Sequence, residues 1–223
     1  MAAEKPQFVM LAGPSGSGKT TFLNNNRDTF PEHVVTPDAF MDQFSDLSKN
    51  EARQNAVVLA NTQQADLIEQ RQSFVQETLL ADEAKIDLLR EMQTRGYETR
   101  LVYMCLNNPK DNEDRVKHRI EEGGNFVPAR LVEKDYHLSL QNLPQAVLVA
   151  DKTQIFDNTA FGEQHAHVVS IDHGAVIEQA PELPQWVEKT FPNGIQAHLD
   201  AGSREREAQQ LGGSRKKSID LDR

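Results

Sequence analysis

Apolar residues in this chain gather in short runs between longer polar stretches, and this pattern predicts its secondary structure. The run at residues 8–12 is continuous and ends before a glycine, as is typical of a strand buried on both faces. Two apolar runs flank Asp172-His173-Gly174, which predicts a hairpin over residues 166–178. Similar short runs predict further strands at residues 33–36, 73–77, 100–106, 146–150 and around 155–156.

The polar stretches between these runs are long enough to form helices. Ile86, Leu89 and Met92 recur at helical spacing, and Pro128 suits the first turn of a helix. We expect helices over residues 46–72, 82–95, 110–122 and 128–141. Because strands alternate with helices, the expected fold is α/β with a central, mainly parallel sheet, which binds ligands beyond the carboxyl ends of its strands.

The chain divides into one domain and a short tail. Its 223 residues suit one fair-sized domain with additions, and we assign residues 1–203 to that domain. Residues 204–223 are polar, contain Gly212-Gly213-Ser214 and show no apolar periodicity after Leu211. Such a segment cannot bury enough apolar surface to offset the entropy lost on ordering, so a disordered tail is predicted.

Composition and charge argue against several partners. The chain has 24 Lys and Arg against 34 Asp and Glu, and the net charge of −10 disfavours nucleic acid and anionic membranes. No apolar run approaches the roughly 18 residues that a membrane span needs, and the N-terminal residues do not resemble a secretion signal. The one cysteine, Cys105, lies in an apolar run and is expected in the core, which favours the reducing cytoplasm.

The strongest chemical signal is a glycine-rich segment directly after the first predicted strand. It fits the pattern G-x-x-x-x-G-K-[ST], whose backbone N–H groups curl around a phosphate group. Its lysine reaches the β- and γ-phosphates, and its last hydroxyl is placed to coordinate Mg²⁺. The residues expected to bind ATP here are Gly13, Pro14, Ser15, Gly16, Ser17, Gly18, Lys19, Thr20 and Thr21, with Thr20 as the Mg²⁺ ligand.

This loop alone does not distinguish kinases from other nucleotide-binding proteins. No N-K-x-D segment is present, which disfavours a GTPase. An ATPase needs a carboxylate after an apolar strand, and Asp151 is a candidate, although it also suits a turn. His165 and His167 lie two residues apart without an evident third ligand, so a metal site is not expected there. Trp186 is expected to anchor the C-terminal segment by packing.

A kinase needs a carboxylate for the acceptor hydroxyl and cations for the transferred phosphoryl group. Asp38 follows the second predicted strand and lies at the edge of the sheet where the phosphate loop is expected. Glu77 and Thr78 end another predicted strand at the same edge. Arginines flank the hinge-like pair Gly123-Gly124, namely Arg115, Arg119 and Arg130.

Taken in order, these motifs resemble the zeta toxin family of phosphate-loop kinases. The resemblance spans about residues 7–160, and its later motifs gain specificity from their order. The segments that carry it are residues 13–20, Pro37-Asp38, Glu77-Thr78-Leu79, Arg95-Gly96-Tyr97, Leu101-Val102-Tyr103, Arg115-Val116, Arg119-Ile120, Gly123-Gly124, Val127-Pro128, Tyr136, Ser139-Leu140, Asn142-Leu143 and residues 155–159.

The resemblance implies a three-layer P-loop NTPase fold of the nucleoside-kinase type, with a helical lid over about residues 110–143. It also implies transfer of the ATP γ-phosphate to a hydroxyl of UDP-N-acetylglucosamine or another nucleotide sugar. By the same resemblance Asp38 is the catalytic carboxylate, and Glu77 and Thr78 contact the acceptor. The remaining implied roles are Lys19 and Thr20 for ATP and Mg²⁺, Arg119 with Arg115 or Arg130 as lid arginines, and Asp157 and Asn158 near the nucleotide base.

Two departures from the family pattern bear on the lid. Asn125 stands where relatives commonly have His, and Lys134-Asp135 stands where they commonly have two arginines. Lysine offers a point charge in place of the arginine fork, and aspartate reverses the sign. The alternative hypothesis is therefore an ATP-binding switch that signals to a protein partner without phosphorylating an acceptor. If the chain is a toxin, an antitoxin-like partner is implied.

Overall fold

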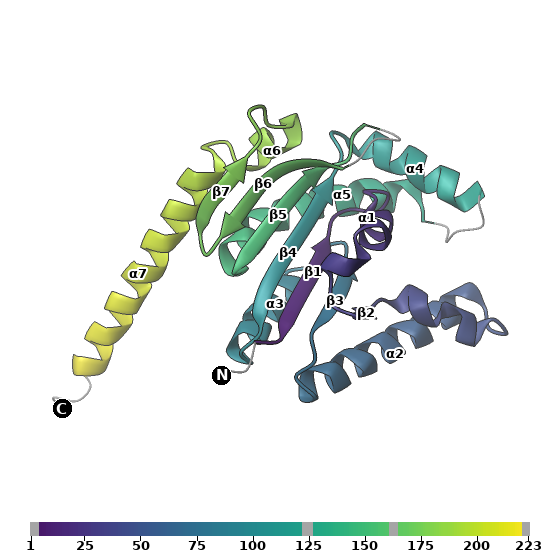
Figure 1. Cartoon of the computed structure of the whole chain (residues 1–223), viewed down its shortest axis with the longest axis horizontal. Helices are drawn as coiled ribbons and strands as arrows, with labels where there is room; N and C mark the ends of the chain where they lie inside the picture. The colour runs from purple at the N-terminus through teal and green to yellow at the C-terminus, as the bar shows by residue number, and fades with distance from the viewer. Residues whose placement is uncertain (1–4, 122–126, 161–164, 220–223) are drawn as a thin grey trace.

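The structure is a computed structural model that describes residues 5–121, 127–160 and 165–219, with side chains described up to residue 208. Within these residues the strands form one sheet in the order β2-β3-β1-β4-β5-β6-β7 (Figure 1). Strands β1 to β5 pair in parallel, whereas β6 and β7 add antiparallel pairs at one end. The strands are β1 (Gln7–Ala12), β2 (His33–Val35), β3 (Phe74–Thr78), β4 (Glu98–Cys105), β5 (Lys152–Asp157), β6 (Ala166–Asp172) and β7 (Ala175–Gln179).

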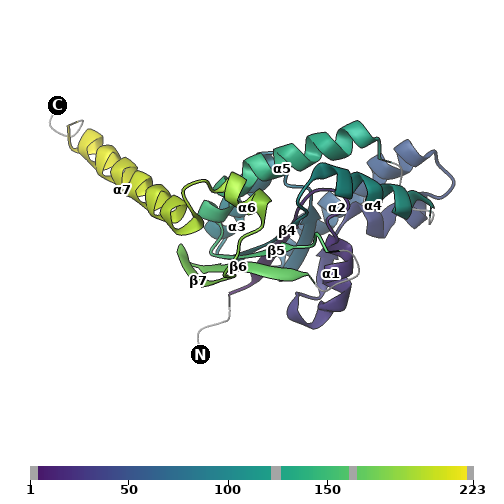
Figure 2. The same cartoon turned by 90° about the horizontal axis from the view of Figure 1, so that it is seen from above.

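Helices cover both faces of this sheet and give the three-layer α/β architecture expected from the sequence. Figure 2 shows α3, α5 and α6 over one face and α1 over the other. The α-helices are α1 (Lys19–Asn25), α2 (Lys49–Glu69), α3 (Ala84–Thr94), α4 (Pro109–Glu121), α5 (Ala129–Val149), α6 (Gln185–Thr190) and α7 (Ile195–Ile219). Shorter 3₁₀ helices are η1 (Arg27–Thr29) and η2 (Pro37–Phe44).

The central strand β1 explains why its sequence is an unbroken apolar run. Phe8 and Met10 face the larger hydrophobic core, beneath α3 and α5. Val9 and Leu11 face the smaller core, beneath α1. Successive side chains of a strand point to opposite faces, so a strand covered on both sides needs apolar residues at every position.

Helix α2 is polar over most of its surface and depends on its first turn and a narrow apolar stripe. Ser48 caps the helix by accepting from the Glu51 N–H, and the Glu51 side chain accepts in return from the Ser48 N–H. The hydrogen bonds from Ser48 lower the pKa of the Glu51 carboxyl. Ala52, Ala56 and Ala60 recur every four residues and are buried. These small side chains let α2 lie close to the β2–β3 edge.

The predicted strand at residues 146–150 is wrong, because α5 continues through Val149 with Pro144 inside it. Ala146 and Val147 are buried in the larger core. A short apolar run serves a buried helical turn as well as it serves a buried strand, so its composition did not distinguish the two.

Asp151 therefore lies just before β5 and does not end a strand. Its carboxylate accepts hydrogen bonds from the N–H and the hydroxyl of Thr99, both at 2.8 Å. Thr99 is near the start of β4, at the edge of the sheet opposite the phosphate loop. Asp151 is thus a structural turn residue, and the ATPase interpretation of this carboxylate is wrong.

The C-terminal segment also differs from the prediction of a disordered tail. Residues 204–219 continue helix α7, which Figure 1 shows extending away from the sheet. The first turns of α7 pack on α5, because Gly202 lies against the Leu148 side chain and the Arg206 guanidinium donates to the Leu148 carbonyl at 2.7 Å. The sequence did not predict this contact, because the segment shows no apolar periodicity.

The other predicted elements are confirmed, with boundaries shifted by a few residues. β6 and β7 form the hairpin expected over residues 166–178. Cys105 is buried in the larger core, as its apolar surroundings indicated. Among the helices of the described ranges, none has both the length and the apolar character that crossing a bilayer requires.

Candidate active site

The phosphate loop connects the end of β1 to the start of α1, as the motif predicts. A hydrogen bond from the Ser17 N–H to the Pro14 carbonyl, at 3.2 Å, bends the loop. Helix α1 begins after Gly18 with no side-chain cap. The N–H groups of a first helical turn have no intrahelical partner, so they are available to an anion held in the loop.

The Lys19 side chain lies within the curl of the loop, and the residue is only 6% exposed. Its ammonium donates to the carbonyls of Gly13 and Pro14, at 2.9 and 3.0 Å. Burial lowers the pKa of Lys19, and the carboxylate of Glu77 acts against that shift. Neutral hydrogen-bond acceptors offset only part of the cost of burying a positive charge, so the site favours binding of a phosphate group.

Thr20 and Glu77 bring a hydroxyl and a carboxylate together beside the loop. The Thr20 hydroxyl lies 3.1 and 3.2 Å from the two carboxylate oxygens of Glu77. Glu77 is adjacent to Leu11 in the parallel pairing of β1 and β3, so the sheet register fixes this approach. The sequence placed Glu77 on the acceptor side, whereas the structure also places it against the phosphate loop.

Asp38 lies in the first turn of η2, directly after β2. The Thr36 hydroxyl caps this turn by accepting from the Asp38 N–H at 3.4 Å. The Asp38 carboxylate forms an ion pair with the Arg53 guanidinium of α2. Their side chains are 60% and 49% exposed, so both are accessible from solvent.

These elements surround one cleft of about 1220 Å³ at the carboxyl ends of the parallel strands. The cleft brings the phosphate loop, Asp38 and helix α4 to a common space. The sequence-predicted site residues that line it are Ser15, Gly16, Gly18, Lys19, Thr20, Thr21, Asp38, Glu77, Thr78, Arg115, Arg119 and Asn158.

Some predicted site residues lie elsewhere. Gly13 and Pro14 do not line the cleft and accept hydrogen bonds from the Lys19 ammonium through their carbonyls, and Ser17 is fully buried. Arg130 is exposed at the start of α5 and does not line the cleft. Asp157 also lies outside the cleft lining.

Helix α4 carries the arginines that face the cleft. Arg115 and Arg119 line it from successive turns, and Val116 on the same helix is buried. The charge of Arg119 contributes to lowering the pKa of Lys19, so the two cations are within electrostatic reach of each other. Because an anion between two cations attracts both and offsets their repulsion, this arrangement suits a polyphosphate.

The two departures from the family pattern have different positions. Asn125, like Gly123 and Gly124, lies outside the described residues. Lys134 is exposed, whereas Asp135 lines the cleft. Burial raises the pKa of the Asp135 carboxyl. The acidic substitution therefore faces the cleft.

Asp157 and Asn158, predicted near the nucleotide base, make contacts within the protein. The Asp157 carboxylate accepts from the Thr159 N–H and hydroxyl, both at 2.9 Å, and from the indole N–H of Trp186 at 2.6 Å. Trp186 is buried against Tyr103, so it does anchor the C-terminal segment. Asn158 donates to the Ser17 carbonyl of the phosphate loop at 2.9 Å.

Sequence reasoning missed the cations of the acceptor side and a buried asparagine on α4. Lys49, Arg53 and Lys85 line the cleft around Asp38. Lys49, Arg53 and Val57 stand four residues apart on α2, and this helical spacing could have identified a common face. Asn112, on α4, donates to the Ser15 carbonyl at 2.7 Å, and no sequence signal singled it out.

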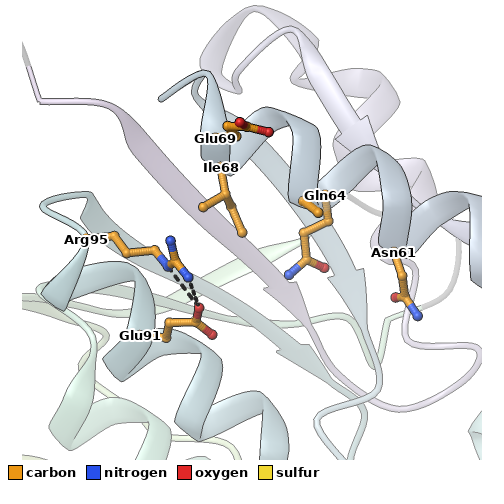
Figure 3. A pocket seen from close by; sticks show the side chains of 7 residues that line it. Asn61, Gln64, Ile68, Glu69, Glu91 and Arg95 are labelled. Carbon is orange, nitrogen blue, oxygen red and sulfur yellow. Dashed lines mark hydrogen bonds and ion pairs between the residues drawn. The ribbon is translucent and has the colours of Figure 1, made fainter.

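A second, smaller cavity lies between α2 and α3 (Figure 3), with a volume of about 390 Å³. Gln64 and Ile68 of α2 face Glu91 and Arg95 across it. Glu91 and Arg95 form an ion pair at 2.8 Å. Because this pair neutralises itself, the cavity offers an anion less than the main cleft does.

His165, one of the two histidines singled out in the sequence, lies beside the phosphate loop. Within the described ranges, no three residues of the His, Cys, Asp and Glu types are placed to hold an ion. His165 lies edge-on against Phe22, with ring centroids 5.1 Å apart, and burial lowers its pKa. It lines the cleft beside Gly18 and closes the loop from the α1 side.

Comparison with known proteins agrees with this geometry. A family model described as Zeta toxin matches residues 1–174. A protein of Haemophilus influenzae described as uncharacterized is 26% identical over 132 residues, which are 57% of this chain and 91% of the relative.

Solved structures share the fold at low sequence identity. A crystal structure described as AvrRxo1-ORF1:-ORF2 with ATP superposes with a TM-score of 0.70 at 18% identity and covers 84% of this chain. This chain spans only 64% of that protein's length. A structure of the PezAT chromosomal toxin–antitoxin system of Streptococcus pneumoniae has a TM-score of 0.59 at 15% identity, covering 93% of this chain and 88% of that one.

Proposed function

Since this chain belongs to the zeta toxin family and has the fold of ATP-using P-loop phosphotransferases, we propose that it is a kinase for a small hydroxyl acceptor. The acceptor we favour is UDP-N-acetylglucosamine or another nucleotide sugar. The observation that carries the proposal is the shared cleft, which is lined by Lys19 and Thr20 of the phosphate loop and by Asp38. A nucleotide switch has no need for a carboxylate on the acceptor side.

In this proposal the phosphate loop holds the ATP β- and γ-phosphates. The loop N–H groups bind the phosphate oxygens, and the Lys19 ammonium exchanges its loop carbonyl partners for the negatively charged phosphates. Arg115 and Arg119 contribute positive charge from α4 above the loop. Cations in a site that excludes water stabilise the charge of the transferred phosphoryl group.

The residues beside the loop fit Mg²⁺. The Thr20 hydroxyl and the Glu77 carboxylate converge within 3.2 Å, and Mg²⁺ prefers oxygen ligands and retains several waters. Thr20 would hold the ion directly, and Glu77 would hold it or one of its waters. When bound, the ion neutralises phosphate charge and orients the leaving group.

On the acceptor side Asp38 orients the hydroxyl and takes its proton as the phosphoryl group is transferred. Its ion pair with Arg53 must open or shift for that role. Lys49, Arg53 and Lys85 line the same cleft, and in this proposal they attract an acceptor that carries phosphate. Thr78 lines the same cleft, and in this proposal it contacts the acceptor.

We extend the proposal to a protein partner of the antitoxin kind. Two proteins of similar fold are described in complexes, one as AvrRxo1-ORF1 with ORF2 and one as a toxin–antitoxin system. A partner that covers the cleft would block access of ATP. Added in equimolar amount to the purified chain, it would abolish phosphorylation, and a partner that leaves turnover unchanged would contradict this extension.

The test is to incubate the protein with Mg²⁺ and ATP and a panel of nucleotide sugars, nucleosides and small metabolites. Mass spectrometry then detects any compound that gains one phosphoryl group. We expect the native protein to produce a phosphorylated nucleotide sugar and Lys19→Ala to produce none. Lys117→Ala is the control and should still produce it, because Lys117 is an exposed residue of α4 that is ion-paired to Asp114. ATP binding without any phosphorylated product would contradict the kinase and favour the switch.

A further inference from the structure

Two asparagines from outside the phosphate loop hold its backbone. The amide nitrogen of Asn112, in the first turns of α4, donates to the Ser15 carbonyl at 2.7 Å. The amide nitrogen of Asn158, directly after β5, donates to the Ser17 carbonyl at 2.9 Å. Asn112 is 0% exposed and Asn158 is 8% exposed. The two residues come from different elements, yet each makes the same bond to alternate carbonyls of one loop.

The direction of these side chains follows from chemistry. A carbonyl oxygen only accepts, so only the NH₂ end of each amide can face it. In a planar trans peptide the carbonyl and the next N–H point in opposite directions. Holding the Ser15 and Ser17 carbonyls outward therefore turns the N–H groups of Gly16 and Gly18 toward the phosphate side.

The motif glycines let the asparagines come this close. A Cβ at Gly16 would lie 2.7 Å from the backbone oxygen of Asn112. A Cβ at Gly18 would lie 2.3 Å from the amide nitrogen of Asn158. Both glycines also have positive φ, at +76° and +93°, which other residues rarely adopt. The glycines therefore allow both the contacts with the two asparagines and the curl of the loop around the phosphate.

We propose that Asn112 and Asn158 are positioning residues that fix the loop in its anion-binding conformation. This proposal rests on the proposed function, because it concerns the same phosphate site. It gives Asn158 a role in shaping the loop in place of the nucleotide contact expected from the family resemblance.

The same contacts also fix the position of helix α4 relative to the loop. Arg119 follows Asn112 by seven residues, so both lie on one face of α4. The Arg115 guanidinium donates to the Asn158 carbonyl at 2.6 Å and links the two asparagines. Because α4 is fixed to the loop at its first turns, the position of Arg119 over the cleft is tied to the conformation of the loop.

The test measures the dissociation constants of ATP and of adenosine for the full chain by NMR titration. The variants are Asn112→Leu and Asn158→Leu, which remove the donor and keep the volume. We expect ATP affinity to fall about tenfold for each, with adenosine affinity unchanged, because each variant frees one loop peptide to rotate. The ratio of the dissociation constant of ATP to that of adenosine therefore rises by the same factor, which a general loss of stability would not produce.

Asn142→Leu is the matched control. Asn142 is buried on α5 and donates to the Leu80 carbonyl at 3.0 Å, away from the phosphate loop. It should lower the free energy of unfolding and leave the ratio unchanged. If either leucine variant fails to fold, Asn112→Ala and Asn158→Ala provide the same measurement.

The outcomes separate this inference from the proposed function. If the unmodified chain binds ATP and both asparagine variants bind it equally tightly, the positioning role is wrong and the kinase proposal stands. If the unmodified chain does not bind ATP, the proposed function itself fails. A fall in ATP affinity matched by an equal fall in adenosine affinity would also overturn the positioning role.

Discussion

The two halves of the cleft are built in opposite ways. On the phosphate side Lys19, Asn112 and Asn158 are buried, and the loop carbonyls that they contact already have hydrogen-bond donors. On the acceptor side Asp38 and Arg53 are half exposed and are held mainly by each other. The phosphate side is thus held in shape by contacts within the protein, whereas the acceptor side has groups that a ligand can rearrange.

This difference indicates that ATP binding is the general part of the chemistry and that acceptor binding is the specific part. A preorganised phosphate site loses little entropy on binding ATP and suits every member of a nucleotide-binding family. An exposed ion pair contributes little to stability and is easily exchanged for a charged ligand. We therefore expect substitutions on the acceptor side to alter turnover and acceptor affinity while they leave ATP affinity intact.

The largest test of this separation is Asp38→Asn. Turnover should fall by about 10²–10⁴ because the acceptor hydroxyl loses its proton acceptor. The dissociation constant of ATP should stay within about twofold, since Asp38 lies outside the phosphate loop. Single-turnover kinetics and ATP titration measure the two quantities, with Asp42→Asn on the same 3₁₀ helix as control. If Asp38→Asn retains its turnover, Asp38 is not the base that takes the proton of the acceptor.

A smaller effect is expected for Arg53→Gln. The KM of a phosphorylated acceptor should rise about tenfold, because one charged hydrogen bond is lost. Arg53→Lys should recover part of the loss, since it keeps the charge without the fork. Steady-state kinetics with varied acceptor measures this at saturating ATP. A changed ATP KM with an unchanged acceptor KM would reverse the assignment of the two halves.

Asp151→Ala provides a baseline far from both halves. It removes the acceptor of hydrogen bonds from Thr99 and from the Gln93 amide. We expect the free energy of unfolding to fall by about 1–3 kcal/mol, measured by urea titration. Turnover of the folded protein should not change. A large loss of turnover would revive a catalytic role for this carboxylate.

The smallest effect concerns Cys105, on the strand behind the phosphate loop. Burial raises the pKa of its thiol to about 12, against about 8.5 in an unfolded chain. The neutral thiol therefore favours the folded state below pH 8.5, and that contribution is lost as the pH rises toward 12. Between pH 8.5 and 10 the native protein should lose about 2 kcal/mol more stability than Cys105→Ala.

Reaction of Cys105 with a thiol reagent checks the same point in a second way. Cys105 should react in the denatured protein and not in the folded protein, because a thiol is unreactive until it ionises. Rapid labelling of the native protein at pH 8 would show that the phosphate side opens in solution, and the contrast between the halves would then be weaker than proposed.

The phosphate side could be predicted from sequence because its constraints are local. Residues 13–20 are consecutive, and their spacing alone encodes the loop, the lysine and the hydroxyl. The order of strands and helices also followed from short apolar runs, since a buried parallel strand needs apolar residues on both faces. The α/β fold is confirmed in the structure, and the loop lies between β1 and α1 as the motif predicts.

Contacts between distant segments could not be predicted in this way. Asn112 and Ser15 are 97 residues apart, and nothing in either sequence context signals the bond. The apolar run at residues 146–150 fitted a strand and a buried helical turn equally well. Arg53 lacked an identifiable role until the fold brought α2 beside Asp38.

The buried indole of Trp186 has a consequence for the smallest unit that can work. The family match ends at residue 174, but Trp186 lies beyond it and donates to Asp157, the neighbour of Asn158. A chain shortened to the family boundary would lose this contact and leave Tyr103 without its aromatic neighbour. We therefore expect the smallest stable unit of this chain to extend beyond the residues by which its family is recognised.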